Sequence, residues 1–242
     1  MPRRTAYHPP AHVDETNLRT LLERSGRAEH GAVQLDLLAA NAKSSGKNDL
    51  TLYYAGNIAL VERRAIAVIG TRKVSDVGRK RANRFARELA AEGIVVVSGL
   101  AAGVDAQALG GAMKEGGDVI AVIGTPIDKA YPAGNARLQE EIYESHLLIS
   151  QFAVGTRTFP SHFPARNRTM AALSDASVII EASESSGTLH QAAECVRLGR
   201  WLGISKGVVE DPRLSWPERF LGYPKCVVLE STHELLERVY GS

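Results

Sequence analysis

The chain has 242 residues, 44% of them hydrophobic and 23% charged, so it is long enough to bury a sizeable core in one domain or in two small ones. Its formal net charge is only +2, which excludes a polycation that binds nucleic acid through bulk charge; such binding would need a local patch. No stretch approaches the roughly 20 apolar residues of a membrane span, and no apolar run follows the basic N-terminus. We therefore expect a cytoplasmic protein with no membrane partner.

The two cysteines, Cys195 and Cys226, both lie inside apolar segments, where we expect buried free thiols. The histidines are scattered along the chain. His8 and His12 have helical spacing, but the two prolines between them forbid a helix there. We therefore expect no metal site and no cofactor.

The N-terminal part of the chain differs in pattern from the rest. Residues 1–15 are typical of a flexible tail, and residues 16–42 have the pattern of two short amphipathic helices broken by glycines. We expect this part, residues 1–50, to be a tail and helical appendage packed on a main domain formed by residues 51–242.

From residue 52 onward the chain alternates short apolar runs with helical patterns. Continuous apolar runs are typical of strands covered on both faces, and the helices between them indicate right-handed crossovers. The predicted strands are 66–70, 94–99, 119–124, 147–150, 177–182, 201–205 and 226–230. The predicted helices are 76–93, 104–117, 135–145 and 187–200. The pattern predicts an α/β protein with a doubly wound, mainly parallel sheet and helices on both faces, plus the short N-terminal appendage.

Ligands of such sheets bind beyond the carboxyl ends of the strands, at the N-termini of helices. Gly70, Thr71 and Arg72 follow the first predicted strand directly. Arg72 is either an anion ligand or a solvated charge. The segment lacks the G-x-G-x-x-G pattern, which disfavours classical dinucleotide binding.

The segment after the second predicted strand, residues 98–105, combines Ser98, Gly99 and Gly103. Backbone N–H groups in such a segment can form an anion-binding nest. The same glycines would also serve tight packing of a helix on a strand, and the residues alone leave both interpretations open.

Hydroxyl groups follow the fifth predicted strand. Ser185, Ser186, Gly187 and Thr188 stand at the start of a predicted helix. Hydroxyls and free backbone N–H groups at a helix N-terminus suit a phosphate, although plain helix capping needs the same residues.

The stretch "FPARNRTMAALSD" carries two arginines around Asn167, just before the fifth predicted strand. Its short helix must cross the sheet to deliver that strand. Arg166 and Arg168 are two residues apart, so they cannot share one face of a helix. We expect one to face the strand-end cleft beside Arg72 and Ser186, and the other to brace the loop or reach a neighbouring phosphate.

Six stretches of the chain appear in a characteristic order: "AVIGTRKVSDVG", "VVSGLAAGVDAQALGGAM", "VIAVIGTPIDKAYPAGNARLQEEI", "LLISQFAVGT", "FPARNRTMAALSDASVIIEA" and "SSGTLHQAAECVRLGR". In this order and spacing they resemble the DNA processing protein A (DprA/Smf) family over about residues 52–204. The resemblance implies an extended Rossmann-like domain that binds and protects single-stranded DNA. It also implies a homodimer that loads a RecA-type recombinase in DNA uptake and recombination, with no catalytic residues.

The resemblance also implies a set of DNA-contacting residues in the matching motifs, and the start of the helix after the fifth strand adds Thr188. The candidate DNA- and phosphate-binding residues are Gly70, Thr71, Arg72, Ser98, Gly99, Arg166, Asn167, Arg168, Ser186, Gly187 and Thr188. The chain departs from the family pattern at Ala102 and Gln151 and across residues 205–226, and no C-terminal winged-helix domain is recognisable.

Two further hypotheses come from other classes. The fold is related to phosphoribohydrolases that resemble lysine decarboxylases, which suggests a nucleotide sensor or a nucleotide-processing enzyme. In their P-G-G-x-G-T-x-x-E motif, Gln191 takes the place of the catalytic glutamate, and an amide cannot act as a general base. Alternatively, Leu138, Ile142 and Leu147 form an apolar surface that could build a dimer interface.

Overall fold

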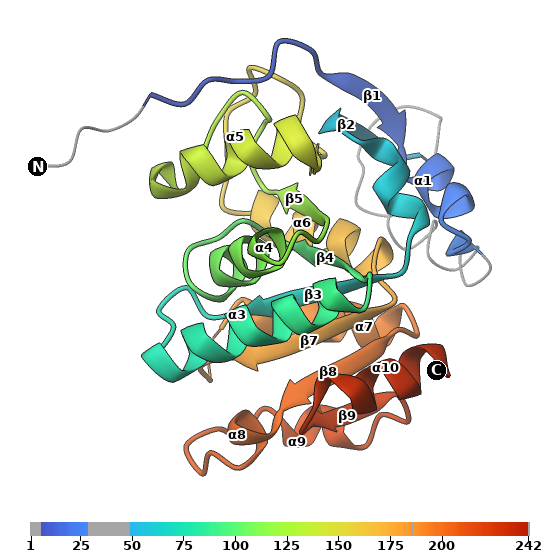
Figure 1. The fold of residues 1–242 in the computed structure, drawn as a ribbon, viewed down its shortest axis with the longest axis vertical. Coiled ribbons are helices and arrows are strands. Elements are labelled where there is room, and N and C mark those ends of the chain that lie inside the picture. Colours follow the sequence, from blue (N-terminus) through green and yellow to red (C-terminus); the bar gives the residue numbers. More distant parts are fainter. Residues whose placement is uncertain (1–5, 29–48, 185, 242) are drawn as a thin grey trace, which may run out of the picture.

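A computed structural model describes residues 6–28, 49–184 and 186–241 (Figure 1). In this part of the chain nine strands form one sheet in the order β1-β2-β6-β5-β4-β3-β7-β8-β9. The seven strands from β3 to β9 pair in parallel, while β2 joins β6 in the antiparallel sense and β1 joins β2 in the same way. This confirms the predicted α/β class and its mainly parallel sheet.

The predicted elements lie where the sequence placed them, and every predicted strand agrees within one residue at each end. The strands are β1 Asp14–Asn17, β2 Thr51–Gly56, β3 Ala65–Gly70, β4 Val95–Ser98, β5 Val119–Ile123, β6 Leu147–Ser150, β7 Ala176–Glu181, β8 Trp201–Ser205 and β9 Cys226–Leu229. The helices are α1 Leu18–Arg24, α3 Asp76–Ala91, α4 Val104–Lys114, α5 Ala136–Ser145, α6 His162–Ala172, α7 Thr188–Arg197, α8 Lys206–Val209, α9 Glu218–Leu221 and α10 Thr232–Tyr240, with 3-10 turns η2 Ile58–Glu62 and η3 Ala133–Asn135.

Helices cover both faces of the sheet. Helices α3, α4, α5 and α10 pack on one face, and α1, α6 and α7 pack on the other (Figure 1). The strands are apolar along their whole length because successive side chains point to opposite faces, and both faces are covered. In β3, for example, Ala67 and Ile69 belong to the core under α6 and α7, whereas Ile66 and Val68 belong to the core under α3 and α4. No helix in the described ranges is long and apolar enough to cross a membrane.

Helix α6 belongs to the connection between β6 and β7. Since β5, β4 and β3 lie between these two strands, the connection passes across the sheet, as predicted. The crossing carries the two-arginine stretch toward the carboxyl ends of the central strands. One contact shows this directly, because Nη1 of Arg166 donates to the carbonyl oxygen of Val122 in β5 at 2.7 Å.

The expectation of a flexible N-terminal tail is wrong for the described residues 6–15. The Tyr7 hydroxyl donates to the carbonyl oxygen of Ile127 at 2.7 Å and accepts from Nε2 of Gln139 at 2.8 Å. Strand β1 then pairs with β2 at the edge of the sheet. The first predicted helix of the appendage is α1, with Leu18 and Leu21 fully buried. The second predicted helix lies outside the described residues.

The predicted apolar dimer surface is also wrong. Ile142 and Leu147 are fully buried in the core of this chain, and Leu138 packs against the same core. Helix α5 turns its apolar stripe toward its own sheet, so Ile142 and Leu147 are not available to a second copy, and Leu138 is only partly exposed.

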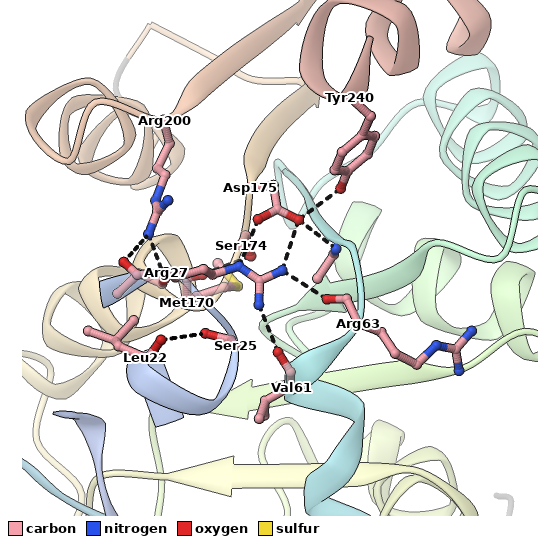
Figure 2. A network of polar contacts seen from close by, with 12 residues as sticks. Leu22, Ser25, Arg27, Val61, Arg63, Met170, Ser174, Asp175, Arg200 and Tyr240 are labelled. Carbon is pink, nitrogen blue, oxygen red and sulfur yellow. Dashed lines mark hydrogen bonds and ion pairs between the residues drawn. The ribbon is translucent and has the colours of Figure 1, made fainter. Parts of the chain in front are cut away.

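The N-terminal segment is tied to the main domain by a buried ion pair (Figure 2). Arg27, only 4% exposed, donates to both carboxylate oxygens of Asp175 at 2.7 and 2.8 Å and to the carbonyl oxygen of Val61 at 2.7 Å. Asp175 also accepts from the Ala65 N–H and the Tyr240 hydroxyl, each at 2.9 Å. Burial opposes ionisation of Asp175, but the Arg27 guanidinium and these two donors outweigh it and hold the pKa of the carboxyl below its usual value.

Both cysteines are free, as predicted, but only Cys195 is buried, and Cys226 is half-buried. Cys195 is fully buried and its thiol donates to the carbonyl oxygen of Trp201 at 2.9 Å. Burial raises the pKa of the Cys195 thiol to about 12 and that of Cys226 to about 11. Both are therefore structural thiols and not nucleophiles.

Candidate functional site

The carboxyl ends of β3 and β7 open onto a cleft of about 520 Å³, here called the central cleft, beside α6 and the start of α7. Eight of the eleven candidate residues line it, which confirms that the chosen strand ends converge. These eight are Gly70, Thr71, Arg72, Arg166, Asn167, Ser186, Gly187 and Thr188. Of the predicted hydroxyl segment, Ser185 lies outside the described residues.

Arg166 lies at the floor of the central cleft and is held rigidly. Its side chain is 5% exposed, with Nη1 bonded to the Val122 carbonyl oxygen at 2.7 Å and Nε bonded to Oδ1 of Asn167 at 3.0 Å. Gly99 makes room for it, since a Cβ atom at Gly99 would lie 1.7 Å from Nη1. Gly99 lines an adjoining hollow of about 190 Å³ and acts on the site through Arg166.

Asp105 is a site residue that sequence reasoning missed. The residue is 5% exposed and lines the central cleft, and its carboxylate accepts from the backbone N–H of Ala101 at 3.4 Å. Burial raises the pKa of Asp105, and the charge of Arg166 works against that rise. Asp105 is the one charged residue in the stretch "VDAQALGGAM", and this was the available signal.

The segment 98–105, considered for an anion-binding nest, uses one of its backbone N–H groups internally. The N–H group of Ala101 donates to the internal Asp105 carboxyl. Gly103 has a φ of +84°, and a Cβ there would lie 2.3 Å from the carbonyl oxygen of Thr71. The glycines of this segment therefore serve close packing, the other interpretation that the sequence left open.

The rim of the central cleft carries exposed cations next to aromatic rings. Arg72 and Lys73 are both exposed, and neither forms an ion pair with any residue in the described ranges. The Arg72 guanidinium lies 5.3 Å from the centre of the Phe163 ring, which in turn lies 5.4 Å from the ring of Tyr131. Two uncompensated charges and the buried Arg166 give the cleft a positive potential.

The N-terminus of α7 forms the opposite wall. The hydroxyl of Ser186 accepts from the backbone N–H of Thr188 at 3.2 Å and donates to the side-chain hydroxyl of Thr188 at 2.8 Å. Gly187 is the N-cap of α7, and Ser186, one residue before it, lines the cleft. The helix N-terminus adds partial positive charge to that of the arginines.

Ser98 and Arg168 lie elsewhere. The hydroxyl of Ser98 is fully buried and donates to the carbonyl oxygen of Val68 at 2.6 Å. Nε of Arg168 donates to a carboxylate oxygen of Glu194 in α7 at 3.2 Å. Of the two arginines in the stretch, Arg166 faces the cleft and Arg168 braces α6 against α7.

Gln191 has a structural contact of its own. It is 1% exposed, and its amide lies between α6 and β7. Oriented with its nitrogen toward α6, the amide donates to the Asn167 carbonyl oxygen at 2.6 Å and accepts from the Ala171 N–H at 3.3 Å and from the Ser177 hydroxyl at 3.2 Å. The position of the hydrolase glutamate is thus filled by a residue that holds α6 in place.

Comparison with known proteins places this geometry in a family. The family model of DNA recombination-mediator protein A matches residues 38–239. DNA processing protein DprA of Streptococcus pneumoniae is 40% identical over 160 residues, 66% of this chain and 56% of that protein. The chain spans about half the length of the curated relatives it matches.

Two solved structures share the fold. The X-ray structure of DprA from Streptococcus pneumoniae has a TM-score of 0.71 and 34% identity, and the match covers 77% of this chain and 65% of that one. DprA from Helicobacter pylori, described with its single-stranded DNA binding mode, has a TM-score of 0.70 and 26% identity over 83% of this chain and 90% of that one. With the motifs, the sheet and the cleft in agreement, the chain belongs to the DNA recombination-mediator protein A family, that of DprA and Smf.

Proposed function

We propose that the protein binds single-stranded DNA and holds backbone phosphates in the central cleft. One observation carries this proposal. The buried guanidinium of Arg166 and the exposed, unpaired side chains of Arg72 and Lys73 converge beside a helix N-terminus. Such a set of donors suits phosphate oxygens, and phosphate contacts supply most of the affinity of proteins that bind nucleic acid without sequence preference.

The aromatic rings at the rim favour a single strand over a duplex. Phe163 and Tyr131 stand beside Arg72, and the Tyr131 side chain is 48% exposed. Bases can stack on such rings when they are not paired, and stacking contributes about 1–3 kcal/mol per base. The relative from Helicobacter pylori, whose structure concerns its single-stranded DNA binding mode, supports the same conclusion.

We extend the proposal to the cellular role. The protein protects single strands in the cytoplasm as a homodimer and delivers them to a RecA-type recombinase, with binding and not catalysis as its task. Membership of the family supports this role. The alternative of nucleotide hydrolysis is not favoured, because Gln191 is occupied in packing α6 and carries no general base.

The test compares a labelled oligothymidylate with a duplex of equal length by fluorescence anisotropy at two salt concentrations. The double variant Arg72→Ala/Lys73→Ala removes two rim charges. Its control, Arg84→Ala/Arg87→Ala, removes two charges from the exposed face of α3, where each arginine is paired with a glutamate.

We expect the wild type to prefer the single strand by about tenfold or more. In a plot of log K against log salt concentration, the rim variant should have a slope that is less steep than the wild-type slope by about 1.4, which is about 0.7 per lost phosphate contact. The control should keep the wild-type slope. Absence of binding at low salt, or equal slopes for rim and control variants, would refute the proposed site.

A further inference from the structure

A second hollow, here called the side groove, continues the central cleft past the start of α7. Its volume is about 380 Å³, and it lies between α7 and residues 216–220. Ser186 and His190 line both the central cleft and the side groove. The two hollows are therefore neighbours that share Ser186 and His190 as a common border.

The side groove combines an apolar floor with an unpaired cation. Leu189, Trp216 and Phe220 line it, and the two aromatic rings meet edge to face with their centres 6.1 Å apart. Arg219 is exposed at its side and forms no ion pair with any residue that the structure describes. The carboxylate of Glu184 accepts from the backbone N–H and the hydroxyl of Ser215, and Arg219 acts on it only through the weaker charge interaction that helps to lower its pKa.

Trp216 adds a second, independent observation. Its side chain is fully buried, and its Nε1–H has no acceptor among the described residues. Buried donors without a partner are unfavourable and rare in native proteins. Because Nε1 has no exposed surface, an acceptor on a strand in the side groove reaches it only when the wall around Trp216 opens.

We propose that the side groove is a second subsite for the same single DNA strand. A base packs on Phe220 and Leu189 there, and the adjacent phosphate meets Arg219 and His190. This inference rests on the proposed function. It goes beyond the set of DNA-contacting residues that the resemblance implied, because Trp216, Arg219 and Phe220 are not among them.

The experiment measures affinity for two oligothymidylates of about four and about twelve nucleotides, which span the usual range of site sizes for single-strand binding domains. The variant is Arg219→Ala. Its control is Arg213→Ala, which removes the same charge from the same segment outside the side groove. A second readout uses a Trp201→Phe background, in which Trp216 is the one remaining tryptophan and reports on the side groove by fluorescence.

We expect Arg219→Ala to weaken binding of the longer strand by about three- to tenfold and to leave the shorter strand unaffected. Trp216 emission should change with the longer strand and not with the shorter one. If the wild type binds both lengths equally, or if the variant weakens both equally, the side groove is not a subsite, although the proposed function stands. A change of oligomeric state in Arg219→Ala would also overturn the inference, because it would assign the groove to a second copy. Failure of the wild type to bind either strand would refute the proposed function itself.

Discussion

The contact between Gly99 and Arg166 gives a sharp test of how the central cleft is built. In the variant Gly99→Ala, the new Cβ would lie 1.7 Å from Nη1, 2.3 Å from Cζ and 2.5 Å from Nη2 of Arg166. Unbonded heavy atoms pack at about 3.5 Å or more, so the guanidinium must move by about 1.5 Å or more. Gly99 does not have a positive φ, so an alanine backbone is allowed and the contact alone decides the outcome.

The displacement has a predictable magnitude. It breaks the 2.7 Å bond from Arg166 to the Val122 carbonyl oxygen and moves the charge that stabilises the buried Asp105 carboxylate. Loss of a hydrogen bond to a charged group costs about 1.5–3 kcal/mol. In a protein of this size, each kcal/mol lowers Tm by about 2–4 °C, so we expect Tm to fall by about 3–12 °C. Affinity for single-stranded DNA should fall in the same variant, because the floor of the cleft is rearranged.

Circular dichroism melting and anisotropy titration measure both effects on one sample. The matched control is Gly110→Ala in α4, where an added Cβ meets nothing within 4 Å. There alanine should be neutral or stabilise by about 0.5–1 kcal/mol, because it lowers the entropy of the unfolded chain. If Gly99→Ala matches the wild type in both Tm and DNA affinity, Arg166 does not occupy the position described here.

Two other substitutions test the ion pair between Arg27 and Asp175 and the role of Arg168. Arg27→Ala leaves the partly buried Asp175 without its partner and should lower the free energy of unfolding in urea by up to about 3–5 kcal/mol. The control Arg24→Ala breaks an exposed pair with Glu62 and should cost less than about 1 kcal/mol. Because the folded-state pKa of Asp175 is lowered, its contribution to stability is present above the unfolded-state pKa of about 3.9 and is lost as pH falls through the lower folded-state pKa. The difference in unfolding free energy between wild type and Arg27→Ala should therefore become smaller in acid. A difference that does not depend on pH would contradict this. Arg168→Ala should leave DNA affinity unchanged and cost at most about 1 kcal/mol of stability, since this side chain pairs with Glu194 outside the cleft; a tenfold loss of affinity would place a phosphate there instead.

The strands that sequence reasoning missed differ physically from those it found. Strands β3 to β8 are covered on both faces and contain mainly β-branched and other apolar residues, a pattern that stands out in the sequence. Strands β1 and β2 lie at the edge, are partly exposed, and hold polar residues such as Asp14 and Glu15. Their pairing depends on contact between parts of the chain that are about 40 residues apart, which no local pattern reveals.

The apolar stripe of α5 illustrates a different limit. Its spacing shows that one face of the helix is buried, but a stripe has the same pattern whether its own sheet or a second copy covers it. The structure places Ile142 against the sheet, and this removes the dimer surface that the pattern suggested.

The local pattern of the chain was sufficient to establish the α/β class, seven of the strands, and the strand ends at which the candidate residues gather. The tertiary structure decided what each of these residues does. Arg166 and Arg168 have the same side chain and nearly the same neighbours in sequence, yet one forms the floor of the central cleft and the other a brace to Glu194. The physical reason is that the direction of each side chain depends on how α6 is rotated against the sheet. Packing with Gly99, Asp105 and Gln191, which are distant in sequence, holds that rotation.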